Sequence, residues 1–360
     1  MTVEREFLLN LLRASLLGRT DFSVPASVNW DVLIEEANRQ VVPVIAVDGL
    51  QRLYDAGVYT ELGDRELRKK KAQWFTHTMK YEQRYAAQRA TAAKLGAWFA
   101  EAGLQTVILK GFTVSECYPI PSHRSSADFD CFLIKDGEHL EAYELGNHVV
   151  EQRGLMVDRR FYKNSSFTVG DLYVENHKFC TPLRGNETLK RFERLLEGIF
   201  LEGPLKAFGD SGLLAPPPMA SALFLTEHAY SHFLHDGLNL RHFLDWALFR
   251  RRHGSDVDWA AFDGYMDEFG FRKFQDAFEH VCAYILGDRK ELTTLEQRML
   301  DSAWAGSDAP KDSTNLFGKF KIASNTLRAA WKYRAFAPIS MPRALWIQVR
   351  GFLFEKKPEL

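Results

Sequence analysis

The sequence predicts an α+β fold in which a small mixed β-sheet core is flanked by an N-terminal and a C-terminal helical region. Two observations carry this prediction. Apolar residues recur at helical spacing towards both ends of the chain, and short β-rich runs with turn residues separate the two helical regions. We therefore divide the chain into an N-terminal helical region (1–100), an α/β core (101–190) and a C-terminal helical domain (191–360).

The composition is that of an ordinary globular protein. The 360 residues are 46% hydrophobic and 26% charged with a formal net charge of −1, so no global charge points to nucleic acid. The 4 cysteines are scattered without a CxxC pair, which indicates reduced thiols rather than disulfides or a zinc site. We expect no signal peptide and no membrane span, because no apolar run approaches the roughly 18 residues that a span needs. The expected location is the cytoplasm.

Helical periodicity dominates the N-terminal region. The expected helices cover residues 7–16, 30–37, 41–53 and 64–102. Asn29 is placed to cap the second helix, and Gly103 ends the long fourth one. The basic run 68–71 is interpreted as a solvated helix face, with contact to phosphates as the alternative.

The α/β core begins where this periodicity ends. Strands are expected over 105–109 and around Asp128 and Asp130, with a helix over 138–153. Short alternating runs then predict a small antiparallel meander with strands at 155–162, 166–169 and 172–179.

The C-terminal region returns to helical spacing. The expected helices cover residues 189–201, 220–234, 238–253, 259–269, 271–286 and 292–305. A Gly/Pro-rich connection over 204–218 separates the first two. The final fifty residues are basic and aromatic, as Lys319, Lys321 and Arg328 illustrate. An amphipathic packing helix is the simpler interpretation, with contact to RNA, a membrane surface or a partner as the alternative.

Asp128 and Asp130 are the first candidates for chemistry. Residues two apart on a strand project to the same side, so both carboxylates share one face, and Glu175 on a later strand has the parity to join them. A second Asp-x-Asp pair ends at Asp258, before an expected helix, where capping explains it. Carboxylate oxygens suit Mg²⁺, and the alternative is an edge-strand acid pair satisfied by water and Arg124.

Such a carboxylate cluster fits phosphoryl or nucleotidyl transfer. One or two Mg²⁺ ions held by these acids would neutralise a triphosphate and lower the pKa of an attacking hydroxyl. Glu175 would then ligate the second ion or act as a base. Gly111, in the turn after the first strand, allows phosphates to approach the backbone closely, and Ser126 is placed to hydrogen-bond a phosphate.

Several motifs resemble the bacterial nucleotidyltransferase-like family, an uncharacterised family of the DNA polymerase β nucleotidyltransferase superfamily. The first group, in family order, is Leu109-Lys110-Gly111, Tyr118-Pro119, Arg124, Asp128 and Asp130. The later motifs are Glu175 with His177 on a strand, and His228, His232, Arg241 and Asp245 on two helices. The resemblance spans residues 105–250, and it departs from the superfamily pattern at Phe112, where a small residue is usual.

The resemblance implies roles for these residues. The Lys110-Gly111 turn would cradle the triphosphate of an NTP, Asp128 and Asp130 would hold Mg²⁺, and Glu175 would complete the carboxylate triad. The remaining residues would form the nucleotide-binding surface; they are Arg124, Ser126, His177, His228, His232, Arg241 and Asp245.

Three histidines on one expected helix leave an alternative open. His228, His232 and His235 have the spacing of a zinc site, although a polar wall of the cleft or buried core histidines explain them more simply. Asp245 would orient one of them or pair with Arg241, and a plain inter-helix salt bridge is the alternative.

The resulting hypothesis is a Mg²⁺-dependent nucleotidyltransferase that moves an NMP from an NTP to a hydroxyl and releases pyrophosphate. The acceptor is a small molecule, a sugar, a protein or RNA, and the near-zero net charge disfavours nucleic acid. Two alternatives remain: a catalytically silent module that binds a nucleotide or a protein, and a toxin-like enzyme that modifies tRNA or protein.

Overall fold

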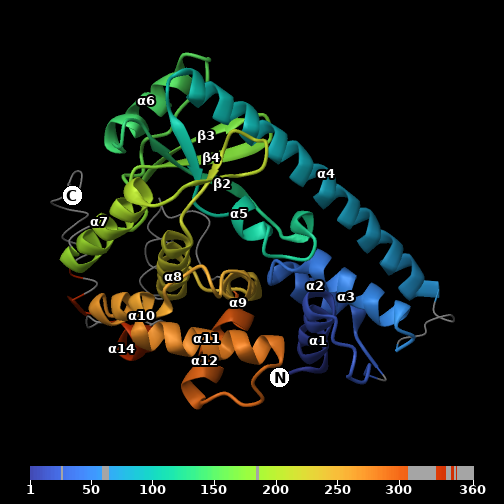
Figure 1. Ribbon diagram of the computed structural model, residues 1–360. Helices are drawn as coiled ribbons and strands as arrows, with labels where there is room; N and C mark the ends of the chain where they lie inside the picture. The colour runs from blue at the N-terminus through green and yellow to red at the C-terminus, as the bar shows by residue number, and fades with distance from the viewer. Residues whose placement is uncertain are drawn as a thin grey trace.

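A mixed six-stranded sheet forms the centre of the structure, which is a computed structural model of the chain. It describes residues 1–25, 27–58, 65–183, 186–306, 330–337, 342–343 and 346. The strands are β1 (Gln105–Ile108), β2 (Asp128–Ile134), β3 (Asn164–Val169), β4 (Leu172–His177), β5 (Lys206–Ala207) and β6 (Leu214–Ala215). Their order across the sheet is β3-β4-β2-β1-β6-β5, and helices pack around the sheet (Figure 1). The predicted α+β fold class is confirmed.

Strand β2 carries both predicted acids and lies inside the sheet. It pairs antiparallel with β1 and parallel with β4, and the second pairing sets Asp130 opposite Glu175. Because side chains alternate along a strand, Phe129 packs into one apolar cluster and Phe132 into the other. Asp128 and Asp130 share the face of Phe132, whose cluster also contains the C-terminal helices.

The predicted three-stranded meander is wrong in its first strand. β3 and β4 form the expected antiparallel hairpin, but residues 155–162 contribute only a bridge between Asp158 and Ser166. Leu155 and Val157 are partly buried against the apolar cluster of Phe129, but Met156 is 90% exposed and the segment pairs with β3 at one position alone. The backbone N–H of Arg160 donates to Asp158 Oδ1 at 2.9 Å, which makes a turn where a strand was predicted.

The segment 204–218, predicted as a plain connection, adds two strands to the sheet. β5 and β6 pair antiparallel with each other, and β6 pairs parallel with β1 through Leu214 and Val107. Each strand is only 2 residues long, too short for alternation to reveal it in the sequence.

The four expected N-terminal helices are confirmed as α1 (Val3–Leu17), α2 (Trp30–Arg39), α3 (Pro43–Asp55) and α4 (Arg65–Glu101). The side chain of Asn29 caps α2, as predicted. Helix α4 has 37 residues and runs from the other N-terminal helices to the sheet (Figure 1). In its basic start, Lys70 pairs with Asp31 at 2.6 Å, whereas the side chains of 65–68 and of 71 lie outside the described residues.

Two short elements and two longer helices complete the core. They are α5 (Phe112–Ser115), the 3₁₀ helix η1 (Pro121–His123) and α6 (Leu140–Glu151), with α7 (Glu187–Glu202) following the sheet hairpin. The remaining C-terminal helices are α8 (Pro218–His235), α9 (Leu240–Arg252), α10 (Trp259–Glu268), α11 (Arg272–Leu286), α12 (Thr294–Ala305) and α14 (Ala330–Phe336). Asp258 caps α10 by accepting from two backbone N–H groups, as predicted.

The two helical regions share one hydrophobic cluster, which includes α1, α3, α8, α9, α11 and α12. Gln40 joins them, because its side chain donates to Ala303 O at 3.0 Å and accepts from Leu240 N at 2.9 Å. Arg13 of α1 donates to Ile285 O at the end of α11. The division of the chain at residues 100 and 190 stays a prediction.

Two further expectations concern the whole chain. All 4 cysteines are free thiols, as predicted. None of the helices within the described ranges combines the length and the hydropathy that a bilayer crossing requires. In the basic aromatic C-terminal segment, Lys319, Lys321 and Arg328 lie outside the described residues. The described part, α14, packs Tyr333 and Phe336 into the shared cluster, as the simpler interpretation of an amphipathic packing helix predicts.

Helices α1 and α3 cross at Gly49, where a methyl group has no room: an added Cβ would lie 2.0 Å from Leu11 O. We expect Gly49→Ala to lower the free energy of unfolding by roughly 1–3 kcal/mol, the usual cost of overpacking, in urea denaturation. The matched control is Gly264→Ala in α10, because an added Cβ meets no atom within 4 Å there. This control should be neutral or stabilising by up to about 1 kcal/mol. Equal destabilisation by both variants would contradict the close crossing.

His123 links η1 to two N-terminal helices. Its Nδ1 lies 2.7 Å from Asp48 Oδ2 in α3, and its Nε2 lies 2.9 Å from Glu82 Oε1 in α4. Burial alone would lower the pKa of His123, but the hydrogen bonds to the two carboxylates outweigh burial and raise the pKa above its ordinary value of 6.5. The folded state therefore holds this imidazole as a cation.

We expect this ring to make stability depend on pH. Because the folded-state pKa is raised, the contribution is fully present below the unfolded pKa of about 6.5 and is lost as pH rises through the folded pKa. The gap in unfolding free energy between wild type and His123→Gln should shrink by roughly 1 kcal/mol from about pH 6 to about pH 9 in urea denaturation. A gap that does not change with pH would show that the ring is neutral.

Candidate active site

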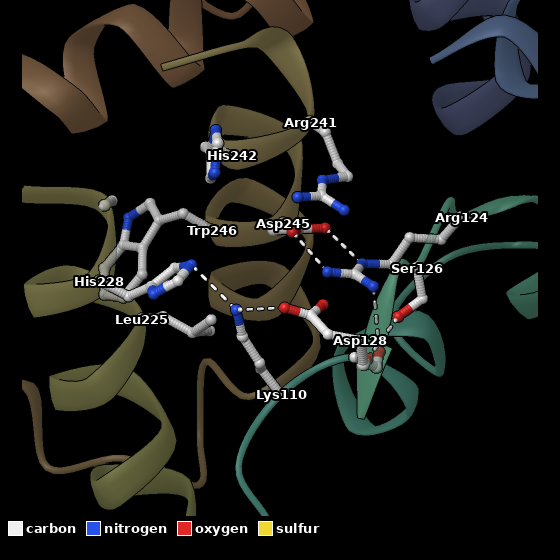
Figure 2. Close-up of a pocket in the computed structure, with 12 residues that line it drawn as sticks. Lys110, Arg124, Ser126, Asp128, Leu225, His228, Arg241, His242, Asp245 and Trp246 are labelled. Atoms are coloured by element: carbon white, nitrogen blue, oxygen red, sulfur yellow. Dashed lines mark hydrogen bonds and ion pairs between the residues drawn. The ribbon is translucent and has the colours of Figure 1, made fainter. Parts of the chain in front are cut away.

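A pocket lies between the turn after β1 and the two helices α8 and α9 (Figure 2). The turn and the loop before β2 contribute Lys110, Gly111, Arg124, Ser126 and Asp128. The helices contribute Leu225, His228, Ala229, Arg241, His242, Asp245 and Trp246. Most of the predicted site residues therefore meet at one pocket, and the other four, Asp130, Glu175, His177 and His232, contact residues of this lining or one another.

The acids of β2 and β4 form a cluster beside the pocket. Potential ligand atoms of Asp130, Glu175 and His177 all lie within 4.8 Å of one another. His177 Nε2 donates to Asp130 Oδ1 at 2.9 Å and lies 3.5 Å from Glu175 Oε2, while its Nδ1 donates to Phe179 O at 3.2 Å. Because both ring nitrogens face acceptors, each must carry a proton, and His177 is therefore an imidazolium.

The pKa values of this cluster follow from the same contacts. Burial alone would lower the pKa of His177, but its hydrogen bonds to Asp130 and Glu175 raise that pKa. Burial alone would raise the pKa of Asp130, but the Lys110 ammonium and then His177 outweigh burial and lower the pKa of this carboxyl. Glu175 is also held ionised, because His177 outweighs the burial that would raise the pKa of Glu175.

Lys110 reaches from the turn to both acids of β2. Its Nζ lies 3.7 Å from Asp128 Oδ2 and 3.4 Å from Asp130 Oδ2, and it donates to His228 Nε2 at 3.3 Å (Figure 2). Burial would lower the pKa of Lys110, but Asp130 and Asp128 raise it. Burial and the nearby ammonium hold the pKa of His228 well below its ordinary value, so this ring is the neutral acceptor.

The carboxylate cluster fits a hard divalent cation. Asp130 is 1% exposed, yet its Oδ2 has no hydrogen-bond partner among the described residues. The Lys110 ammonium, 3.4 Å from this oxygen, is the cation that compensates it in the structure. A buried carboxylate oxygen without a hydrogen bond can also be compensated by Mg²⁺, which prefers oxygen ligands of this kind. Asp128 and Glu175 supply the neighbouring oxygens, so these three residues could hold the ion.

A buried ion pair fastens the turn to α9. Arg124 Nε and Nη2 donate to Asp245 Oδ1 and Oδ2, each at 2.7 Å, and Arg124 Nη1 donates to Gly111 O at 3.3 Å. The Tyr118 hydroxyl also donates to Asp245 Oδ1 at 2.7 Å. The expectation that Asp245 pairs with Arg241 or a histidine is therefore wrong. The alternative in which Arg124 satisfies the acids of β2 is wrong as well, because Arg124 donates to Asp245 and to Gly111 O. The sequence identifies Tyr118 only as part of the Tyr-Pro motif, because its position in the chain does not show where the hydroxyl points.

Arg241 is a pocket cation that forms no direct ion pair with a carboxylate in the part of the chain that the structure describes. Its Nη1 donates to Ser125 O at 2.9 Å, and its buried Nε has no hydrogen-bond partner within the described part of the chain. Burial, followed by the nearby Arg124, lowers the pKa of Arg241. Because Arg124 and Asp245 neutralise each other, Arg241 leaves the pocket wall with positive charge that an anion can meet.

Three imidazoles lie together at the pocket, two of them in its lining, but they are not the predicted three. His228 and His232 of α8 lie beside His242 of α9, with ring centroids 4.4 Å apart for His228 and His232 and 5.1 Å apart for His232 and His242. His235 instead approaches Tyr333. His242 follows Arg241 in the sequence, but only the packing of α9 on α8 shows that it completes the group.

Hydrogen bonds argue against a zinc site at these imidazoles. His242 Nδ1 accepts from the backbone N–H of Asn239 at 3.1 Å, so the neutral ring carries its proton on Nε2. Burial and the nearby Arg241 hold the pKa of His242 well below its ordinary value. With His228 Nε2 engaged by Lys110, two of the three rings already use the lone pair that a metal would need. A polar wall of the pocket is the better interpretation.

Phe112 does not obstruct the turn. Its ring is 3% exposed and packs against Tyr85 and Phe129, with centroids 5.5 Å and 5.8 Å away, in the apolar cluster on the other side of the sheet. Gly111 has φ 80°, a conformation that glycine adopts readily, and an added Cβ would lie 3.3 Å from Ser126 Oγ. The turn therefore presents Gly111 to the pocket and directs Phe112 into the core.

Comparison with known proteins supports the assignment that these residues suggest. Searches of the curated proteins and of the solved structures found no match. The sequence model of one protein family, described as an uncharacterised nucleotidyltransferase, matches residues 26–287. This match spans both walls of the pocket and most of the chain. The chain therefore belongs to this family of uncharacterised nucleotidyltransferases.

Proposed function

We propose that this protein is a Mg²⁺-dependent nucleotidyltransferase that moves an NMP from an NTP to a hydroxyl acceptor and releases pyrophosphate. One observation carries the proposal: the buried Asp130 carboxylate, with an oxygen that lacks a hydrogen-bond partner among the described residues, lies beside a pocket lined by the cation Arg241. Cation-binding oxygens next to an anion-binding wall are what a metal–triphosphate complex requires. Membership of a nucleotidyltransferase family supports the same reaction.

Three acids would hold the ion: Asp128, Asp130 and Glu175. Bound there, Mg²⁺ supplies Lewis-acid stabilisation of the phosphoryl oxygens. The lowered pKa of Glu175 keeps it ionised, which suits a metal ligand better than a general base. His177 holds the oxygens of Asp130 and Glu175 in place by donating its Nε2 proton between them.

The cations and the turn would bind the triphosphate. Arg241 and Lys110 line the pocket and offer N–H donors to phosphate oxygens, and Gly111 leaves the backbone of the turn accessible. Arg124 does not need to contact the nucleotide, because its pairing with Asp245 holds the turn against α9. His228 and His242, as neutral rings, form a polar wall that adds no charge.

We expect Asp130→Asn to reduce transfer by about 100-fold or more, because loss of a metal ligand costs at least as much as loss of a residue that only orients a ligand. Pyrophosphate release with each NTP, Mg²⁺ and a panel of hydroxyl acceptors would measure it. The matched control is Asp258→Asn, which keeps a side-chain cap on α10 and should behave as wild type. Equal turnover by wild type and Asp130→Asn would contradict the metal site. Tight NTP binding without turnover across the panel would favour the catalytically silent module.

We expect Arg241→Gln to weaken NTP binding by about tenfold, because it removes a positive charge from the pocket wall. Calorimetric titration with Ca²⁺ in place of Mg²⁺ would measure affinity without turnover. Arg251→Gln is the matched control in the same helix, because Arg251 pairs with Asp288 outside the pocket. Equal NTP affinity of wild type and Arg241→Gln would show that the triphosphate lies elsewhere.

A further inference from the structure

The Lys110 ammonium takes up a position between the two acids that the proposed metal needs. Its Nζ lies 3.7 Å from Asp128 Oδ2 and 3.4 Å from Asp130 Oδ2. A Mg²⁺ ion binds carboxylate oxygens at about 2.1 Å, so an ion that used both Oδ2 atoms would lie within a few ångströms of Nζ. Two cations that close repel strongly, and Lys110 and the ion therefore compete for the same oxygens.

Lys110 and the ion compete because the buried carboxylate of Asp130 requires a cation beside it. This carboxylate is 1% exposed, and leaving a buried charge without a compensating cation is strongly destabilising. Lys110 and His177 supply the compensating charge in the structure described here. An ion that replaces Lys110 beside these acids displaces its ammonium. Because the Lys110 side chain is 14% exposed, the displaced ammonium needs another partner within the protein.

The pocket offers that partner on one side of Lys110. The ammonium already donates to His228 Nε2, which lies on α8 and lines the pocket (Figure 2). Arg241 lines the same pocket, so a phosphate bound there would lie among cation donors. A phosphate oxygen is a stronger acceptor for an ammonium than a neutral imidazole, so an occupied pocket draws Lys110 away from the acids.

We propose that Lys110 is a built-in competitor for the metal, which blocks the carboxylates until the phosphates of the nucleotide draw it into the pocket. This inference rests on the proposed function, because it uses the same metal and nucleotide. Metal and phosphate then bind with positive cooperativity, and by linkage each raises the affinity of the other by the same factor. The acids would hold a divalent ion tightly only when the nucleotide is present.

The test measures Mn²⁺ binding by electron paramagnetic resonance, with and without inorganic pyrophosphate. For wild type we expect weak Mn²⁺ binding alone and binding on the order of tenfold tighter with pyrophosphate. Lys110→Met should bind Mn²⁺ alone on the order of tenfold more tightly than wild type, and pyrophosphate should add little. The matched control is Arg241→Met, which removes a cation from the same pocket without freeing the acids. It should leave the affinity for Mn²⁺ alone within about twofold of wild type.

Two results would overturn the inference: Lys110→Met binding Mn²⁺ alone no more tightly than wild type, or Arg241→Met gaining as much affinity as Lys110→Met. If Lys110→Met fails to fold in thermal unfolding, Lys110→Gln carries the same expectation with a polar side chain. The outcome is separable from the proposed function. If wild type turns over an acceptor but the Lys110 variants bind Mn²⁺ with the same affinity as wild type, the inference is overturned and the proposed function stands. Tighter Mn²⁺ binding by Lys110→Met without turnover of any acceptor by wild type supports the inference and contradicts the transferase.

Discussion

The burial of the Asp130 carboxylate is the constraint on which the arrangement of this site depends. A carboxylate inside a sheet is stable only where donors and cations surround it. Here Lys110 approaches from the turn after β1, and His177 approaches from the end of β4. The parallel pairing of β2 with β4 adds Glu175 opposite Asp130. One carboxylate thus joins the turn and two strands at a common point, through Oδ2 to Lys110 and through Oδ1 to His177, beside the oxygens of Asp128 and Glu175.

A second buried interaction joins this point to the C-terminal helices. The pair of Arg124 with Asp245, supported by the Tyr118 hydroxyl, connects the loop before β2 to α9. Because this pair is internally neutral, the remaining positive charge on the pocket wall comes from Arg241. The pocket consequently has an acidic side for a metal and a basic side for phosphates. The family match covers both sides, which agrees with one functional unit built from the core and the helices.

Local patterns in the sequence determined the fold class, the main helices and the acids of β2. Helical spacing, the cap at Asn29 and the cap at Asp258 are properties of short segments, so the sequence alone predicts them and the tertiary structure retains them. Alternation along a strand likewise placed Asp128 and Asp130 on one face, and parity placed Glu175 with them. The motif order further predicted that α8 and α9 belong to the same site, since the resemblance linked them.

Tertiary packing alone decided which of these residues touch. The pairing of Asp245 with Arg124, the replacement of His235 by His242 and the position of Lys110 between two acids all join residues far apart in the chain or on separate elements. Strands β5 and β6 are too short for any periodicity, and they exist because β1 offers a free edge to pair with. Sequence patterns record which face a side chain occupies on its own element. Strand register and helix packing determine what that face meets, because these contacts depend on the whole chain.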